Sequence, residues 1–195
     1  MKVVIIKYNA GNIRSVLFAL ERIGIQAVVT DDNDEIRSAD RVIFPGVGEA
    51  SSAMNYLKEK GLDKLICSLT QPFLGICLGM QLMCSHSEEN DTDCLGIFDQ
   101  KVKLFPQKGL KVPQIGWNNI FGLKSGLFEG VSDGAYMYFV HSYFVEECDN
   151  AIAKTDYVIP YSSAIQKNNF SAVQFHPEKS GEVGQKILEN FIKGY

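Results

Sequence analysis

Short apolar runs alternate with amphipathic stretches along the first half of the chain. Residues 2–7, 26–30, 41–44 and 73–76 are runs rich in β-branched and aromatic residues, which predict buried strands. After a glycine-containing turn at 8–12, apolar residues recur three and four positions apart over 13–23, which predicts an amphipathic helix ending at Gly24. A second helical stretch is expected from residue 49 to about residue 69. This alternation predicts a parallel sheet with helices on both faces.

The pattern changes after about residue 88. Strand-like segments separated by glycine and acidic turns follow one another, and a closing helix is expected at about 182–192. The expected strands are 101–105, 114–121, 136–145, 151–155, 163–166 and 171–175. No repeat or linker marks a second unit. We therefore expect one domain over residues 1–195, an α/β fold whose mostly parallel central sheet is flanked by helices and carries an added antiparallel part.

Composition and charge exclude several classes of protein. The chain has 46% hydrophobic and 22% charged residues, and its net charge of −4 argues against nucleic acid as the main partner. The apolar run near the N-terminus is too short for a signal peptide or a membrane span. The five cysteines are odd in number and form no CxxC pair, so neither a disulfide framework nor a zinc site is indicated. We expect a reduced, cytoplasmic protein with no metal, cofactor, membrane or nucleic-acid partner.

The segment Gly75-Ile76-Cys77-Leu78-Gly79 joins a predicted strand to a predicted helix. A thiol at the apex of such a turn, with glycines two residues to either side, has the spacing of a strained nucleophile elbow. The adjoining helix N-terminus favours thiolate over thiol. The spacing therefore predicts an exposed, activated nucleophile. The alternative is a purely structural turn, and the other four cysteines are interpreted as small core residues.

A cysteine nucleophile requires a base, and His176 has the best context of the three histidines. It follows the predicted strand 171–175, and Pro177 biases it toward an extended conformation, so that His176 and Glu178 project to the same side. A carboxylate there orients an imidazole. The alternative is a turn with a satisfied histidine. His141, inside a predicted strand, is a less favoured second base, and His86 is expected on the surface.

Pro45-Gly46-Val47-Gly48 interrupts the chain at the carboxyl end of the third predicted strand. It is either a plain turn or a loop that lends a backbone N–H near Val47 to an oxyanion, with the N–H of Leu78 as the second donor. It lacks the spacing and the lysine of a phosphate-binding loop.

Two segments carry a resemblance to a known family. Gly-Ile-Cys-Leu-Gly-Met-Gln at 75–81 and His-Pro-Glu-Lys at 176–179 resemble the class I, triad-type glutamine amidotransferases, and the resemblance extends over nearly the whole chain. Four further segments (8–16, 45–48, 113–118 and 138–143) resemble the glutaminase subunits of imidazole glycerol phosphate synthase, in histidine biosynthesis. Tyr8-Asn9 departs slightly from the acidic residue that often follows the first strand in that family, which affects no catalytic residue.

The resemblance implies a Cys77, His176 and Glu178 triad that hydrolyses glutamine to glutamate and ammonia through a thioester. Backbone N–H groups near Val47 and Leu78 are then expected to hold the oxyanion. The residues that the family places around glutamine correspond to Gly48, Gln81, Glu89 and the backbone of Ser142 and Tyr143. The loop that holds Glu89 is equally consistent with a solvated acidic turn.

The resemblance also implies a partner. Ammonia would pass to a (β/α)8-barrel cyclase in a heterodimer, and Asn12, Trp117 and Lys179 match family positions at the subunit interface. For Trp117 an ordinary core position is the alternative. Three other functions stay open: a glutaminase subunit of another ammonia-dependent synthase, a stand-alone hydrolase of γ-glutamyl bonds, and a catalytically silent scaffold for a barrel protein.

Overall fold

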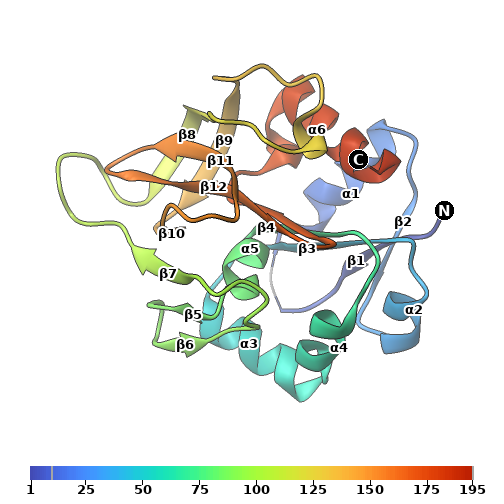
Figure 1. Ribbon diagram of the computed structural model, residues 1–195. Coiled ribbons are helices and arrows are strands. Elements are labelled where there is room, and N and C mark those ends of the chain that lie inside the picture. The colour runs from blue at the N-terminus through green and yellow to red at the C-terminus, as the bar shows by residue number, and fades with distance from the viewer. Residues whose placement is uncertain (10, 195) are drawn as a thin grey trace.

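A mostly parallel sheet runs through the computed structural model, which describes residues 1–9 and 11–194 (Figure 1). Its parallel part has the order β2-β1-β3-β4-β13, with β1 in register with both β2 and β3. Apolar β-branched and aromatic residues fill β1, β3, β4 and β13 because both faces of the sheet are covered there, whereas Val28 of the edge strand β2 is exposed. The bounds are β1 Val3–Ile6, β2 Ala27–Thr30, β3 Arg41–Gly46, β4 Phe73–Cys77 and β13 Phe170–Val173.

The antiparallel part continues from β13 through β12, β10 and β7, with β11 paired to β12 and the short β5–β6 hairpin at the edge. Strands β8 and β9 form a separate two-stranded sheet. The bounds are β5 His86–Ser87, β6 Thr92–Asp93, β7 Lys101–Leu104, β8 Gln114–Asn119, β9 Tyr136–His141, β10 Tyr143–Val145, β11 Ala151–Asp156 and β12 Pro160–Lys167.

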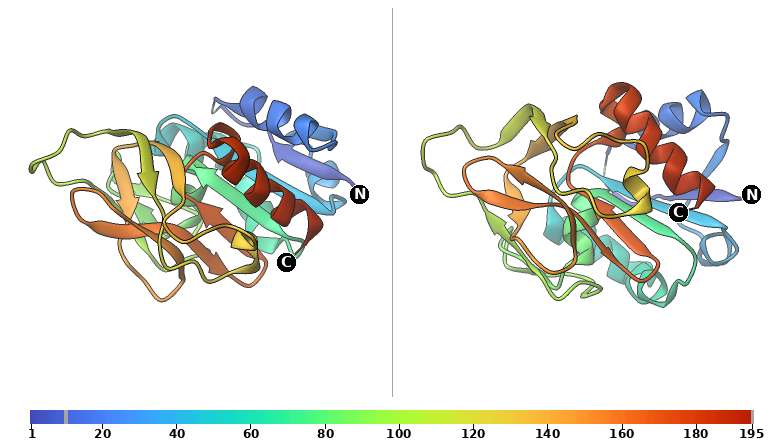
Figure 2. Two further views of the ribbon diagram at one scale, coloured as in Figure 1. Left: turned by 90° about the horizontal axis from the view of Figure 1, so that it is seen from above. Right: turned by 45° about the horizontal axis from the view of Figure 1, so that its top comes forward.

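Helices cover both faces of the parallel sheet (Figures 1 and 2). Strand β1 shows why: Val3 and Ile5 join one apolar core, and Val4 and Ile6 join the other. The first core packs against α1 and α6, and the second against α3, α4 and α5. The predicted fold class is confirmed. The bounds are α1 Ile13–Arg22, α3 Ala50–Glu59, α4 Leu62–Ser68, α5 Leu78–Met83 and α6 Gly181–Lys193, and two 3-10 turns cover Gly126–Phe128 and Pro177–Lys179.

Two predicted elements are divided in the structure. The helix expected over 49–69 is two helices, because Gly61 takes a left-handed conformation between them (φ 67°). The strand expected over 136–145 is broken at Ser142. The chain leaves the β8–β9 sheet there and enters the central sheet as β10, while the Ser142 carbonyl accepts the N–H of Phe105.

The third strand runs two residues further than expected and includes Pro45, which pairs with Ile76 of β4. The Pro45 carbonyl accepts the Tyr8 hydroxyl at 2.7 Å on the side where β1 has already ended. The missing N–H of proline therefore removes no ladder bond.

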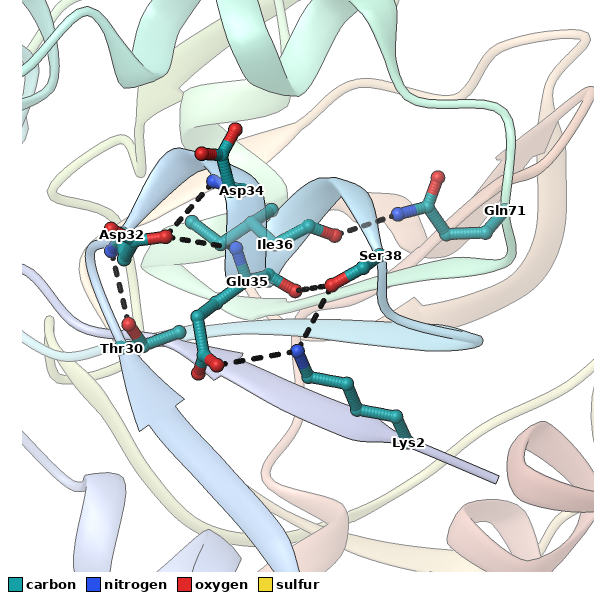
Figure 3. A network of polar contacts seen from close by, with 8 residues as sticks. All are labelled: Lys2, Thr30, Asp32, Asp34, Glu35, Ile36, Ser38 and Gln71. Atoms are coloured by element: carbon teal, nitrogen blue, oxygen red, sulfur yellow. Dashed lines mark hydrogen bonds and ion pairs between the residues drawn. The ribbon is translucent and has the colours of Figure 1, made fainter.

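Helix α2, Asn33–Arg37, and the β5–β6 hairpin were not expected from the sequence. The Asp32 side chain accepts the N–H groups of Asp34 and Glu35 at 3.0 and 2.9 Å and so caps α2 (Figure 3). Lys2 Nζ donates to the hydroxyl of Ser38, the residue that follows this helix, at 3.0 Å. Elements this short give no periodic signal.

Ala10, in the predicted turn 8–12, and Tyr195, in the predicted domain, lie outside the described residues. No helix in the described part of the chain is long and apolar enough to cross a membrane.

Candidate active site

Cys77 lies at the point where β4 turns into α5, with φ 53° and ψ −107°. This left-handed backbone is strained for any residue with a side chain. The flanking glycines are required by space. A Cβ on Gly79 would lie 1.9 Å from the Phe44 carbonyl oxygen, and one on Gly75 would lie 2.5 Å from Met83 Sδ. The sequence thus builds a tight elbow with a thiol at its apex.

A pocket of about 280 Å³ opens beside Cys77. The end of β3 and the elbow meet here because Gly46 pairs with Cys77 in the sheet. The chain around the break at Ser142 completes the wall of the pocket. Gly48 in its wall has φ 143°, a conformation that disfavours other residues. Every residue predicted for the oxyanion and for glutamine lines this pocket. The lining residues are Val47, Gly48, Cys77, Leu78, Gln81, Glu89, Pro113, Val140, His141, Ser142 and Tyr143.

His176 and Glu178 form a buried pair, with Nδ1 2.8 Å from Oε1. The expected contact is present, although Glu178 reaches it from the 3-10 turn Pro177–Lys179 and not from an extended strand. Burial lowers the pKa of His176, but interactions with the Cys77 sulfur and the Glu178 carboxylate outweigh burial and raise the pKa to about 10. Because Glu178 occupies Nδ1, Nε2 is the nitrogen left for proton exchange with Cys77.

Of the three predicted interface residues, one contacts this pair and the other two lie against the Tyr138 ring. The Asn12 side-chain amide donates to Glu178 Oε1, so Asn12 contacts the carboxylate directly. Lys179 Nζ lies 6.0 Å from the centre of the Tyr138 ring. The Trp117 ring meets the Tyr138 ring edge-on at 5.9 Å and remains 55% exposed. The alternative of a core position for Trp117 is therefore wrong.

A buried amide network that the sequence does not predict lies beside the Cys77 sulfur. Gln174 Nε2 lies 3.6 Å from Cys77 Sγ, and Gln174 Oε1 accepts from Gln81 Nε2 at 3.1 Å. The same Gln81 nitrogen donates to the Tyr143 carbonyl at 3.1 Å. The only signal in the sequence was a polar Gln174 inside the apolar run 172–175, two residues before His176.

His141 lines the pocket as a neutral imidazole. Burial lowers the pKa of His141 to about 4, and the hydrogen bond to the Tyr143 carbonyl offsets part of this effect. That carbonyl accepts from Nδ1 at 2.7 Å. Nε2 lies 3.1 Å from Gln114 Oε1 and 3.2 Å from the Tyr161 hydroxyl. With no carboxylate beside it, His141 is placed to hold the Tyr143 backbone.

His86 is less exposed than expected. Its Nε2 lies 3.2 Å from Asp91 and its Nδ1 lies 3.3 Å from Asp93, within the β5–β6 hairpin that the sequence did not reveal.

Glu89 is half-buried and reaches the start of α3. Its Oε2 accepts the N–H of Ala50 at 2.8 Å. Burial raises the pKa of Glu89, and the hydrogen bond from the Ala50 N–H offsets part of this rise. A solvated acidic turn does not describe this side chain. Across residues 1–9 and 11–194, no group of three His, Cys, Asp or Glu side chains is arranged to hold a metal ion.

Comparison with known proteins places this site in a family. The sequence model described as "Glutamine amidotransferase class-I" matches residues 4–194. A protein of Bacteroides thetaiotaomicron, named imidazole glycerol phosphate synthase subunit HisH, is 59% identical over 194 residues, which cover 98% of this chain and 99% of that protein. The protein of the same name from Bacteroides fragilis is 58% identical over 99% of this chain and 100% of its own length.

Two solved structures agree with the fold. One, described as a glutamine amidotransferase, superposes with a TM-score of 0.76 at 17% identity, covering 97% of each chain. A glutamine amidotransferase from Thermotoga maritima superposes with a TM-score of 0.62 at 17% identity, covering 99% of this chain and 83% of that one. At that identity the likeness concerns the fold alone. The elbow, the pocket and the sequence matches over nearly the full length lead to one conclusion: the chain belongs to the class I glutamine amidotransferase family, among the HisH subunits of imidazole glycerol phosphate synthase.

Proposed function

We propose that this protein hydrolyses glutamine to glutamate and ammonia and supplies the ammonia to a cyclase subunit in histidine biosynthesis. One observation carries the proposal. In a chain 59% identical to a HisH subunit, the Cys77 thiol occupies the strained elbow, next to the buried His176–Glu178 pair. Cys77, His176 and Glu178 then form the catalytic triad.

The reaction begins when Cys77 gives its proton to His176 Nε2 and its sulfur attacks the side-chain amide carbon of glutamine. The raised pKa of His176 makes its imidazole a better acceptor for this proton. His176 returns the proton to the leaving nitrogen, the C–N bond breaks, and ammonia departs from a γ-glutamyl thioester. A water molecule, deprotonated by His176, then attacks the thioester and releases glutamate and the thiol. The sum is glutamine plus water to glutamate plus ammonia.

The pocket supplies the remaining roles. The backbone N–H of Leu78 and one near Val47 stabilise the oxyanion, and one such donor is typically worth about 3 kcal/mol. Glutamine is held by Gly48, Gln81, Glu89 and the backbone of Ser142 and Tyr143. All of these residues line the same 280 Å³ cavity, which supports the assignment. The Glu89 carboxylate is negative and the α-ammonium group of glutamine is positive, so the two groups attract each other.

The partner we propose is a (β/α)8-barrel cyclase that uses the ammonia to make imidazole glycerol phosphate and aminoimidazole carboxamide ribotide. It forms a heterodimer with this chain in the cytoplasm, where thiols stay reduced. Residues 1–195 act as one type-1 amidotransferase domain. Asn12, Trp117 and Lys179 mark the docking face, and the bond from Asn12 to Glu178 links that face to the triad.

The test is glutamate release from glutamine, with and without the cyclase loaded with its ribonucleotide substrate. Low activity alone and a large rise with the loaded cyclase are expected. High activity alone, or no response to this cyclase, would assign the same chemistry to another synthase or to a stand-alone hydrolase. Activity that persists in Cys77→Ala would overturn the triad, and inactivity under every condition would leave only a scaffold.

A further inference from the structure

The Cys77 sulfur has two polar neighbours besides His176, and they act in opposite directions. The Val140 carbonyl, 3.7 Å away, is an acceptor only, so it binds the thiol proton and opposes charge on the sulfur. Gln174 Nε2, 3.6 Å away, is an amide donor, and a donor is worth more to a thiolate than to a thiol. Gln174 is fully buried, so water does not compete for its N–H.

The orientation of the Gln174 amide follows from one backbone group. The Tyr143 carbonyl can only accept, so the Gln81 nitrogen must face it at 3.1 Å. The second hydrogen of that nitrogen goes to Gln174 Oε1 at 3.1 Å. With its oxygen held there, Gln174 must turn its NH₂ group toward the sulfur. Both Gln81 hydrogens are then used, so Gln81 meets glutamine through Oε1 alone, as an acceptor.

We propose that Gln174 is a further catalytic residue, which donates an amide hydrogen bond to the Cys77 thiolate, and that Gln81 holds it in that orientation. The proposal rests on Cys77 being the nucleophile of the proposed glutaminase. As the thiol proton moves to His176, the Gln174 N–H meets the charge that develops on sulfur.

The test is the pH dependence of Cys77 alkylation by iodoacetamide in the isolated protein, followed by peptide mass spectrometry. Gln174→Met keeps an unbranched side chain of similar length and removes the donor. We expect the midpoint of the alkylation profile to move up by about one pH unit, with alkylation about tenfold slower on the acidic side and near wild type on the alkaline side. Cys67 is exposed and is not the core residue expected from the sequence, so its thiol serves as an internal reference and must keep its own profile in the same samples.

Ser163→Ala is the matched control. Ser163 lies on the neighbouring strand, and its backbone carbonyl accepts the backbone N–H of Gln174 at 2.8 Å. Its buried hydroxyl has no partner among the described residues. Its alkylation midpoint should stay at the wild-type value. A Gln174→Met profile with an unchanged midpoint, or a rate lowered equally at every pH, would overturn the role of Gln174. Neither result touches the proposed function, which is tested separately by glutamate release with and without the cyclase and by the activity of Cys77→Ala.

If Gln174→Met does not fold, the wild-type protein still decides the question. The side-chain amide resonances of Gln174 in ¹⁵N–¹H spectra should shift with pH as the thiol ionises, and this shift should disappear in Cys77→Ala. Gln174 resonances that do not move in the wild-type protein, or that move identically in Cys77→Ala, would overturn the hydrogen bond.

Discussion

Tyr8 contacts the end of strand β3 through its side-chain hydroxyl. Its hydroxyl donates to the Pro45 carbonyl at 2.7 Å, and burial together with nearby Cys77 raises the pKa of Tyr8 well above its usual value, so the proton stays in place. Tyr8→Phe removes this bond and keeps the ring contact with Phe44. We expect chemical denaturation to show a loss of about 1–2 kcal/mol in the free energy of unfolding.

Tyr56→Phe is the control for that loss. The Tyr56 hydroxyl donates to the Asp31 carboxylate at 2.9 Å in a more exposed place, where water replaces a lost bond. Its variant should lose less stability than Tyr8→Phe. Equal losses would show that burial of the Tyr8 bond contributes nothing.

His141 makes stability depend on pH in the acidic range. Its pKa is about 4 in the folded state and about 6.5 in an unfolded chain. The unfolded chain therefore binds the extra proton between these values, and the free energy of unfolding falls as pH is lowered from 6.5 to 4, by up to about 3 kcal/mol. Denaturation at several pH values should show a shallower slope in His141→Gln than in wild type. A slope in His141→Gln as steep as that of the wild-type protein would contradict this assignment.

At the scale of elements, the start of α3 connects the loop 45–48 to the glutamine pocket. The Glu49 carboxylate caps α3 by accepting the N–H groups of Ser51 and Ser52 at 2.7 and 2.9 Å. The Glu49 carboxylate also accepts from Asn90 Nδ2 at 2.8 Å. This bond holds the tip of the β5–β6 hairpin, where the neighbouring Glu89 accepts the N–H of Ala50. These hydrogen bonds lower the pKa of Glu49 to about 2, the Ser51 contact contributing most.

Glu49→Ala should therefore lower the free energy of unfolding by about 1 kcal/mol and raise KM for glutamine more than it lowers kcat. Asp32→Ala is a matched control, because Asp32 caps α2 in the same way at a distance from the pocket (Figure 3). It should lose stability and keep KM. Steady-state kinetics with the cyclase present would count against a positioning role for Glu49 if both variants had the same KM.

The strands and helices with clear periodicity were predictable, and the short or divided ones were not. The run at 73–76 and the spacing over 13–23 gave β4 and α1 nearly to the residue. The break of the helix at 49–69 had a local signal in Gly61. The break at Ser142 had none, because it depends on which strand lies beside each half of the run 136–145.

At the scale of the whole molecule, the site was predictable as far as chain topology determines it. Parallel strands place their carboxyl ends at one edge, so Cys77, His176 and the loop 45–48 had to lie near one another. The contacts of Gln174 with Cys77 and of Asn12 with Glu178 depend on side-chain packing across the sheet. Spacing along the sequence carries no information about such contacts.

The exposed face of the β8–β9 sheet gives the last prediction. Three large apolar side chains are exposed there: Ile115 (59%), Trp117 (55%) and Tyr136 (59%). The Tyr138 ring contacts both Trp117 and Lys179, so Lys179 lies close to this face. Apolar side chains exposed together indicate a surface that a partner covers.

Trp117→Ala should weaken binding to the cyclase by about 10- to 100-fold and hardly change the stability of the isolated chain. Titration calorimetry measures the first effect and denaturation the second. Phe18→Ala on α1, where the side chain is 57% exposed, is the matched control and should bind like wild type. Equal affinities of the Trp117 and Phe18 variants would place the cyclase on another face of the molecule.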